Sequence, residues 1–455
     1  MSIKATSPEP RRCDLLVRAD LVVTQNDART IIENGGVAVL DGLVTAVGRY
    51  TDLEREYDPV ERLDLGGKML MPGLVNGHTH LPMTLFRGFA DDLPLMAWLQ
   101  EHIWPVEFQL NEALLDIGAR IGCAELIRTG CTAFLNGYFH EQITGKAASA
   151  AGLRAVLGEG FFHFPSPHFP DAEACWTTIR RLDAAFADDH LVRTAVTPHA
   201  VFTVAPQELA ASFELARELN IPWQVHAAES PAETATCMEK YGKRPLEILR
   251  DEGLLSPRTV LHHCVDLTDE EIELLADSGA CVVHCPVSNL KLCSGISPVQ
   301  RLVDAGATVG LGTDGAASNN QLNLFRDMAV AALIGKVRSG DASAVSASTV
   351  LDMATRGSAR CLGWDGLGRI QAGCPADMIA LELASPNLTP IYDPVSHAVY
   401  AATGSEVCMT MVAGRVLYLY GEYRTMDIAT LRSEAKDAAR WARTVRDTQK
   451  NTKRT

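Results

Sequence analysis

From Pro72 onward the sequence repeats one pattern, a short apolar run followed by a stretch with helical spacing. Eight runs fit this pattern: 74–80, 132–139, 154–161, 193–200, 222–229, 258–265, 280–287 and 308–315. Apolar residues in the intervening stretches recur every three or four positions, as on one face of an amphipathic helix. Eight strand–helix units over roughly 300 residues predict an α/β fold, a (β/α)8 or TIM barrel with parallel strands.

Both ends of the chain carry a different pattern. Residues 13–70 consist of short runs rich in Val, Leu and Ile, separated by Gly and Asp-Gly, and the same pattern returns after Pro375. Such runs are typical of strands joined by turns. We therefore predict one small composite β-sandwich domain from 13–70 and 375–423, a barrel over 71–374, and a C-terminal helix over 426–449.

The composition excludes several classes of protein. Acidic residues outnumber basic ones 56 to 41, for a net charge of −15, whereas a nucleic-acid binder needs a basic face to replace phosphate counterions. The sequence has no apolar run of about 18 residues, so we expect no membrane span. Its first residues lack the apolar region of a secretory signal, and its 12 cysteines are scattered. We therefore expect reduced thiols and a cytoplasmic protein, and we expect a homo-oligomer.

Histidines gather where the predicted strands end. In a barrel of this kind, the carboxyl ends of the strands form the face that carries the active site. Histidines of a core would instead be scattered through helices and strand centres. The polar residues at these ends are His78, His80, His199, His226, His263, His284 and Asp314.

Four of these residues form a candidate metal site. His78 and His80 lie two positions apart, so both side chains leave the strand on the same side. Together with His226 and Asp314 they offer three imidazoles and one carboxylate, a set that suits Zn²⁺ or Fe²⁺ and leaves a position for water. Four such groups converging without a metal would be costly to desolvate. The sequence therefore predicts a bound divalent metal, with zinc preferred.

Three further residues lie beside this set. Glu229 follows His226 by three positions and could reach a substrate without binding the metal; a surface carboxylate at a helix start is the alternative. His263 is a candidate base or electrophile, or else a buried structural histidine. Its neighbour His262 is expected to point the other way, into the barrel wall. For His284, contact with substrate and packing are equally good interpretations.

Several motifs resemble the amidohydrolase superfamily. They are PGLVNGHTH, VHAAE, HCVDL, HCPVSN and GLGTDGAASNN, together with the long stretch over 78–107. Within that superfamily they are similar to deaminases of 5′-methylthioadenosine and S-adenosylhomocysteine, over nearly the whole chain. The resemblance implies a single metal held by His78, His80, His226 and Asp314. No lysine is present in the third or fourth predicted strand to bridge a second ion.

The resemblance also implies a substrate site and a reaction. Glu107 would bind the ribose hydroxyls of an adenine nucleoside, His199 would contact the nucleoside, and Trp98 would line the pocket. The expected reaction is hydrolytic deamination. Asp314 would take a proton from the attacking water, and Glu229 would protonate N1 of the adenine.

In this scheme His263 would hydrogen-bond the attacking oxygen and stabilise the tetrahedral intermediate.

A triazine hydrolase or a guanine-type deaminase would use the same machinery, and the general acid and the metal set do not separate these activities from nucleoside deamination. The expected binding of ribose by Glu107 favours a nucleoside substrate over a triazine or guanine. A non-catalytic scaffold is a remote alternative, because such a protein would have lost ligands and none is lost here.

One departure from the family concerns the loop after the third strand. Relatives that take S-adenosylhomocysteine typically carry an arginine there for the amino-acid carboxylate. This chain has Phe161, Phe162, Phe164 and Phe169 between Glu159 and Ala174, and no Arg or Lys. We therefore predict a preference for 5′-methylthioadenosine, with an aromatic wall around the methylthio group. Glu159 or Asp171 would repel a substrate carboxylate, although either could instead meet the substrate's amino group.

Overall fold

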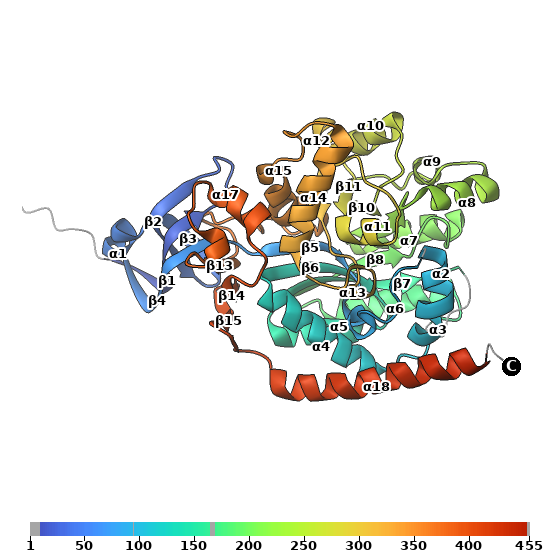
Figure 1. Cartoon of the computed structure of the whole chain (residues 1–455), viewed down its shortest axis with the longest axis horizontal. Coiled ribbons are helices and arrows are strands. Elements are labelled where there is room, and N and C mark those ends of the chain that lie inside the picture. The colour runs from blue at the N-terminus through green and yellow to red at the C-terminus, as the bar shows by residue number, and fades with distance from the viewer. Residues whose placement is uncertain (1–9, 94, 164–168, 453–455) are drawn as a thin grey trace, which may run out of the picture.

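The computed structural model describes residues 10–452, except for 94 and 164–168. It contains two eight-stranded sheets, and Figure 1 shows them side by side. One sheet is parallel and belongs to the barrel, and the other is assembled from both ends of the chain. Among the described residues, no helix combines the length and the apolar character that a membrane crossing requires.

The barrel confirms the eight predicted strands. Every predicted run overlaps one observed strand, and neighbours in sequence pair in parallel from β5 to β12. The backbone N–H of Asp314 donates to the carbonyl of His78 at 3.0 Å, which brings the end of the last strand against the first. The strands are β5 (Leu74–Thr79), β6 (Cys131–Tyr138), β7 (Arg154–Phe161), β8 (Val192–Pro198), β9 (Trp223–Ala227), β10 (Thr259–His263), β11 (Cys281–His284) and β12 (Thr308–Leu311).

Helices surround the barrel and bury their apolar faces against its strands in the main core. Several begin at a capping side chain, as Asn111 does by accepting the N–H of Leu114. Their bounds are α4 (Glu112–Arg128), α5 (Glu141–Ala151), α6 (Ala172–Ala185), α7 (Pro206–Leu219), α8 (Pro231–Tyr241), α9 (Pro245–Asp251), α10 (Asp269–Ser278), α11 (Pro286–Lys291), α12 (Val299–Asp304), α13 (Ala316–Asn319), α14 (Leu324–Ser339), α15 (Ala347–Asp352) and α16 (Ser358–Cys361).

The second sheet confirms the composite β unit. Its strand order is β16-β15-β14-β13-β4-β1-β2-β3, so β4 from one chain end pairs with β13 from the other. At its far edge, Val44 of β3 bonds to Cys374, just before β13, and the sheet thus curls back over its own core. The strands are β1 (Arg11–Val23), β2 (Ile31–Leu40), β3 (Leu43–Arg49), β4 (Tyr57–Pro72), β13 (Met378–Glu382), β14 (Val407–Val412), β15 (Arg415–Leu419) and β16 (Glu422–Tyr423); α1 (Tyr50–Glu56) lies between β3 and β4.

An irregular helical segment covers one side of the barrel mouth. It runs through η1 (Leu81–Phe86), α2 (Leu95–Ala97), the π-helical η2 (Trp98–Ile103) and α3 (Trp104–Glu107). The C-terminal helix α18 (Ile428–Thr452) lies along the barrel and packs on α4 and α3. Ala438 of α18 is buried in the same apolar cluster as Trp98. The remaining short elements are η3 (Met353–Gly357), η4 (Pro386–Leu388), α17 (Pro394–Ser396) and η5 (His397–Ala401).

Candidate active site

Three histidines converge at the carboxyl ends of the barrel strands. One ring nitrogen from each of His78, His80 and His226 lies within 4.8 Å of the others. Nδ1 of His80 bonds to the carbonyl of Gly137 and Nδ1 of His226 to that of His199, both at 2.5 Å. These carbonyls take the outer nitrogens, so each Nε2 is left to face the centre, the arrangement found around protein-bound metals.

Asp314 completes the cluster from the end of β12. Its Oδ1 lies 3.3 Å from Nε2 of His80 and 3.5 Å from Nε2 of His78. Its Oδ2 accepts hydrogen bonds from the hydroxyls of Ser288 at 2.6 Å and Ser318 at 2.7 Å. Asp314 has a left-handed backbone, with φ of 62°, so the chain turns its carboxylate back over the barrel.

The protonation states of His78 and Asp314 suit the binding of a metal cation. Burial lowers the pKa of His78 to about 3, so its imidazole is neutral at pH 7. Burial raises the pKa of the Asp314 carboxyl, but its hydrogen bond with His78 and the nearby His80 outweigh this and hold it well below its usual range. Neutral imidazoles and a carboxylate are the forms that bind a divalent metal. The residues present therefore fit one divalent ion.

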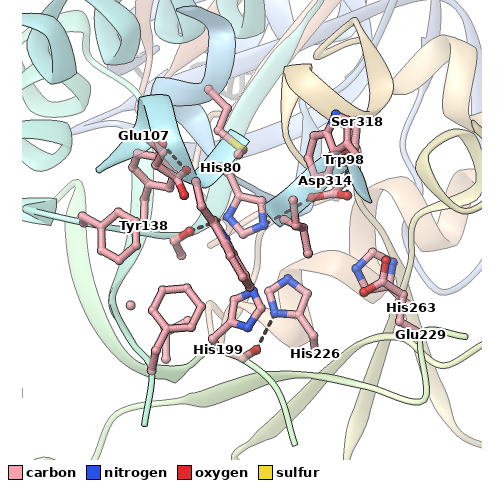
Figure 2. Close-up of a pocket in the computed structure, with 18 of the residues that line it drawn as sticks. His80, Trp98, Glu107, Tyr138, His199, His226, Glu229, His263, Asp314 and Ser318 are labelled. Carbon is pink, nitrogen blue, oxygen red and sulfur yellow. Dashed lines mark hydrogen bonds and ion pairs between the residues drawn. The ribbon is translucent and has the colours of Figure 1, made fainter. Parts of the chain in front are cut away.

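Glu229 and His263 lie together on one side of this cluster (Figure 2). Glu229 follows β9 and is buried, and burial raises the pKa of its carboxyl while His263 lowers it by less. Nδ1 of His263 lies 2.8 Å from Oδ1 of Asn289. The structure thus places a carboxyl that holds its proton more tightly than usual next to an imidazole anchored at one nitrogen.

The expectation for His262 is wrong. Its ring stacks on His78 with centroids 3.7 Å apart, and its Nε2 lies 2.8 Å from Oε1 of Gln224, inside the barrel. His263 reaches the mouth as well because its backbone is left-handed, with φ of 73°. The strand therefore ends with a turn, and the alternation that holds within a strand no longer applies at its last residue.

Glu107 lies across the pocket from Glu229, and Trp98 also lines the pocket. The hydroxyl of Tyr138 donates to Oε1 of Glu107 at 2.5 Å. Burial raises the pKa of Glu107 to about 7, and the bond from Tyr138 lowers it by less. Trp98 is buried in the wall, and His199 also lines the pocket, with Nδ1 at 2.9 Å from the Thr203 hydroxyl.

The sequence matches the amidohydrolase family over residues 69–417. This range covers more than half of the chain. The chain belongs to the amidohydrolase family.

Solved structures and curated relatives agree with this. A 5-methylthioadenosine/S-adenosylhomocysteine deaminase of Nitratidesulfovibrio vulgaris is 50% identical over 433 residues, 95% of this chain and 98% of the relative. A crystal structure of an adenosine deaminase from Xanthomonas campestris with bound zinc superposes with a TM-score of 0.94, at 37% identity over 96% of this chain and 100% of that one. The zinc complex of an atrazine chlorohydrolase from Arthrobacter aurescens has a TM-score of 0.86 at 24% identity over 93% of this chain and 100% of that one, a similarity of fold alone.

The wall of the amidohydrolase pocket differs from the predicted one. Phe162 lines it, but Phe161 packs on Trp176 and Phe169 is in the main core, while Phe164 lies outside the described residues. The other aromatic lining residues come from elsewhere in the chain: Trp98, Trp104, Tyr138, Phe139 and Phe202. Among the described residues, no arginine or lysine lines this pocket.

The two acids of that loop do not face a substrate. Glu159 is fully buried and accepts the backbone N–H groups of His140 and Glu141, at 2.5 and 3.0 Å. Asp171 caps α6 by accepting the N–H of Ala174 at 2.9 Å. The repulsion expected from them is therefore wrong, because both carboxyls are bonded to backbone N–H groups, Glu159 to the segment between β6 and α5 and Asp171 to the first turn of α6.

Sequence reasoning missed the residues that support the site. Tyr138 ends a predicted strand without any motif to mark it, and Ser288, Asn289 and Ser318 lie within HCPVSN and GTDGAASNN, where the motif gives them no role. Each forms a hydrogen bond with a predicted site residue. His284 is 1% exposed and is not among the residues that line the pocket, which favours packing over substrate contact.

Proposed function

We propose that this chain is a metal-dependent deaminase that hydrolyses 5′-methylthioadenosine to 5′-methylthioinosine and ammonia. The observation that carries the proposal is one pocket with two different ends. One end holds His80, His226 and Asp314, with His78 beside them, and the other holds the buried Glu107 with Tyr138. The curated relatives named for this activity, at up to 50% identity, support it.

The metal in this proposal is a single zinc ion, with ferrous iron as the second choice. His78, His80, His226 and Asp314 would hold it, and the zinc bound by the Xanthomonas campestris structure supports the choice. When bound, such a metal lowers the pKa of water to about 7 and makes hydroxide available at neutral pH. Its ligands are fixed in advance by the carbonyls behind His80 and His226 and by the serines behind Asp314.

Asp314 takes the proton of the attacking water as the oxygen adds to C6 of the adenine. Glu229 gives its proton to N1, so that negative charge does not accumulate on the ring. Its raised pKa supports this role, because the carboxyl keeps its proton closer to neutral pH. His263, held through Nδ1 by Asn289, turns its other nitrogen to the attacking oxygen and stabilises the tetrahedral intermediate. A proton transferred to the amino group then releases ammonia.

The nucleoside is held at the other end. Glu107 accepts hydrogen bonds from the ribose hydroxyls, with Tyr138 fixing one of its oxygens. His199 contacts the nucleoside and Trp98 packs on it. Aromatic side chains line the pocket, and no arginine or lysine does so among the residues that the structure describes, which suits an apolar 5′ group. Contacts between its sulfur and an aromatic ring are worth about 0.3–1.5 kcal/mol. We therefore propose 5′-methylthioadenosine as the preferred substrate over S-adenosylhomocysteine.

The protein of this proposal is cytoplasmic and forms a homo-oligomer. All 12 cysteines are free thiols, which supports a reducing compartment. The domain boundaries predicted at 13–70, 71–374, 375–423 and 426–449 are part of the same proposal.

The test is a panel of substrates assayed for ammonia with the metal-loaded protein. Release from 5′-methylthioadenosine, with none from guanine and no chloride or amine from chlorotriazines, supports the proposal. A reaction with guanine or a chlorotriazine in place of the nucleoside would assign the machinery to the alternative reactions. Protein without metal and without activity would instead support a scaffold.

A further inference from the structure

The turn that carries Glu229 is tightly constrained. After β9 the chain takes a left-handed conformation at Ala228, with φ of 51°. The carbonyl of Ala228 accepts two backbone N–H groups from the next loop, those of Val265 at 2.8 Å and Asp266 at 3.0 Å. A non-glycine residue keeps such a conformation only where its surroundings hold it. The position of the Glu229 side chain therefore depends on the bonds made within this turn.

Glu233, in the first turn of α8, makes one of these bonds. The backbone N–H of Glu229 donates to Oε2 of Glu233 at 2.7 Å. The Glu233 side chain is buried, at 5% exposure, and belongs to a helix that Ser230 caps by accepting the N–H of Glu233 at 3.3 Å. One buried carboxyl thus joins the helix start to the backbone of the proposed proton donor.

Two neighbouring helices show how this differs from an ordinary helix cap. Glu247 in α9 and Glu271 in α10 occupy the same third position, and each accepts the N–H of its own N-cap residue at 2.8 Å. That is the usual capping box. Glu233 bypasses its N-cap residue, Ser230, and accepts the N–H one position earlier, at Glu229.

We propose that Glu233 is a positioning residue, which holds Glu229 in place to protonate the substrate. The inference deepens the proposed function and rests on it, since it requires Glu229 to be the proton donor. A shift of about 1 Å in a reacting group lowers a rate by roughly 10²-fold. Loss of the Glu233 bond should therefore reduce kcat and leave the metal ligands untouched.

The bond requires an oxygen at the right distance and no charge. Burial raises the pKa of Glu233 to about 8, so its carboxyl is mainly neutral at pH 7. Glutamine has the same length and also presents a carbonyl oxygen. Aspartate is one methylene shorter, and alanine has no acceptor. The three substitutions therefore separate the hydrogen bond from the charge and from the side-chain volume.

The experiment compares kcat, KM and metal content for Glu233→Ala, Glu233→Asp and Glu233→Gln with 5′-methylthioadenosine. Glu247→Ala is the matched control, because it removes a glutamate from the same helix position, where it makes only the usual capping box, in a helix away from the pocket. We expect the Ala and Asp variants to lose roughly 10- to 100-fold in kcat with metal content unchanged. Glu233→Gln should keep kcat within about threefold of wild type, and Glu247→Ala should keep it too.

Hydrogen exchange at the Glu229 amide provides a readout besides activity. It should accelerate in the Ala and Asp variants and stay slow in Glu233→Gln. Unchanged kcat in the Ala and Asp variants would overturn the proposal, as would a Gln variant as slow as they are. If Glu233→Ala does not fold, Glu233→Asp decides the matter. A wild-type protein that releases no ammonia would defeat the proposed function instead, and the exchange pattern would still report on the bond.

Discussion

The two ends of the pocket are built from different kinds of structure. The metal end, formed by His78, His80, His226 and Asp314, rests on the ends of β5, β9 and β12. The nucleoside end, formed by Trp98, Glu107 and Tyr138, rests mainly on the irregular segment through η2 and α3. Strand ends are positioned by the hydrogen-bonded sheet, whereas the irregular segment is positioned by side-chain packing. Substitutions at the metal end should therefore change metal content or kcat, whereas substitutions at the nucleoside end should change kcat/KM with the metal retained.

The largest effect should come from the metal end. His226→Ala removes a ligand whose orientation the carbonyl of His199 fixes, so we expect loss of the metal and of measurable activity. Metal analysis of the purified variant is the measurement. His397→Ala, which removes a ring bonded to the carbonyls of Pro390 and Asp393, is the control and should keep the metal. A metal-loaded His226→Ala protein would contradict the assignment.

The next effect separates proton donation from metal binding at the same end. Glu229→Gln keeps the size of the side chain but has no proton to give, and kcat should fall by roughly 10²-fold or more. Metal content should stay near that of wild type, because Glu229 is not needed to complete the ligand set. Glu239→Gln, an exposed change on α8, should alter neither quantity. Metal loss in Glu229→Gln would show that its role is misassigned.

A smaller effect should come from the nucleoside end. Glu107→Ala removes the proposed acceptor for the ribose hydroxyls, and kcat/KM for 5′-methylthioadenosine should fall roughly 10- to 100-fold, as for the loss of charge-assisted hydrogen bonds. The metal should remain. Glu101→Ala, an exposed change on the same segment, is the matched control. Equal losses in the two variants would point to a disturbed segment and not to a lost contact.

The binding of the nucleoside should depend on pH through the Glu107 carboxyl. Its pKa is raised to about 7, so the charged form that accepts most strongly is lost as pH falls through that value. KM for the nucleoside should therefore rise below pH 7 in wild type, by a factor of a few. In Glu107→Gln the rise should be absent, since the amide does not titrate. A rise of the same size in both proteins would assign it to another group.

A further effect concerns the 5′ group of the substrate. The part of the chain that the structure describes places no arginine or lysine in the pocket wall. We therefore expect kcat/KM to be roughly tenfold higher for 5′-methylthioadenosine than for S-adenosylhomocysteine, whose carboxylate would lack a charged partner. A side-by-side measurement decides it. Equal values would mean that the carboxylate is recognised elsewhere, for example by a neighbouring subunit.

The metal end could be predicted from sequence because strand periodicity and barrel topology are regular. His78 and His80 share one side of β5, and parallel strands bring their carboxyl ends to one face. The same rule failed for His262 and His263, because the left-handed conformation at His263 falls on the last residue of β10. Periodicity therefore assigns residues within a strand and loses accuracy at the residue where the strand stops.

The nucleoside end could be predicted only through the family resemblance. Nothing in the spacing of Trp98 and Glu107 separates them from an ordinary buried tryptophan and an exposed glutamate. The contribution of Tyr138 depends on a contact between segments 31 residues apart. The loop with Glu159 was misjudged for the same reason, since a buried carboxylate that binds backbone N–H groups has the same sequence as one that faces a ligand.

The central claim is most directly tested by ammonia release from 5′-methylthioadenosine before and after removal of the metal. We predict one ammonia for each nucleoside consumed, loss of the reaction after a chelator, and recovery when one equivalent of zinc per chain is returned. Activity that survives complete metal removal, or a zinc-loaded protein that releases no ammonia from any adenine nucleoside, would contradict the account.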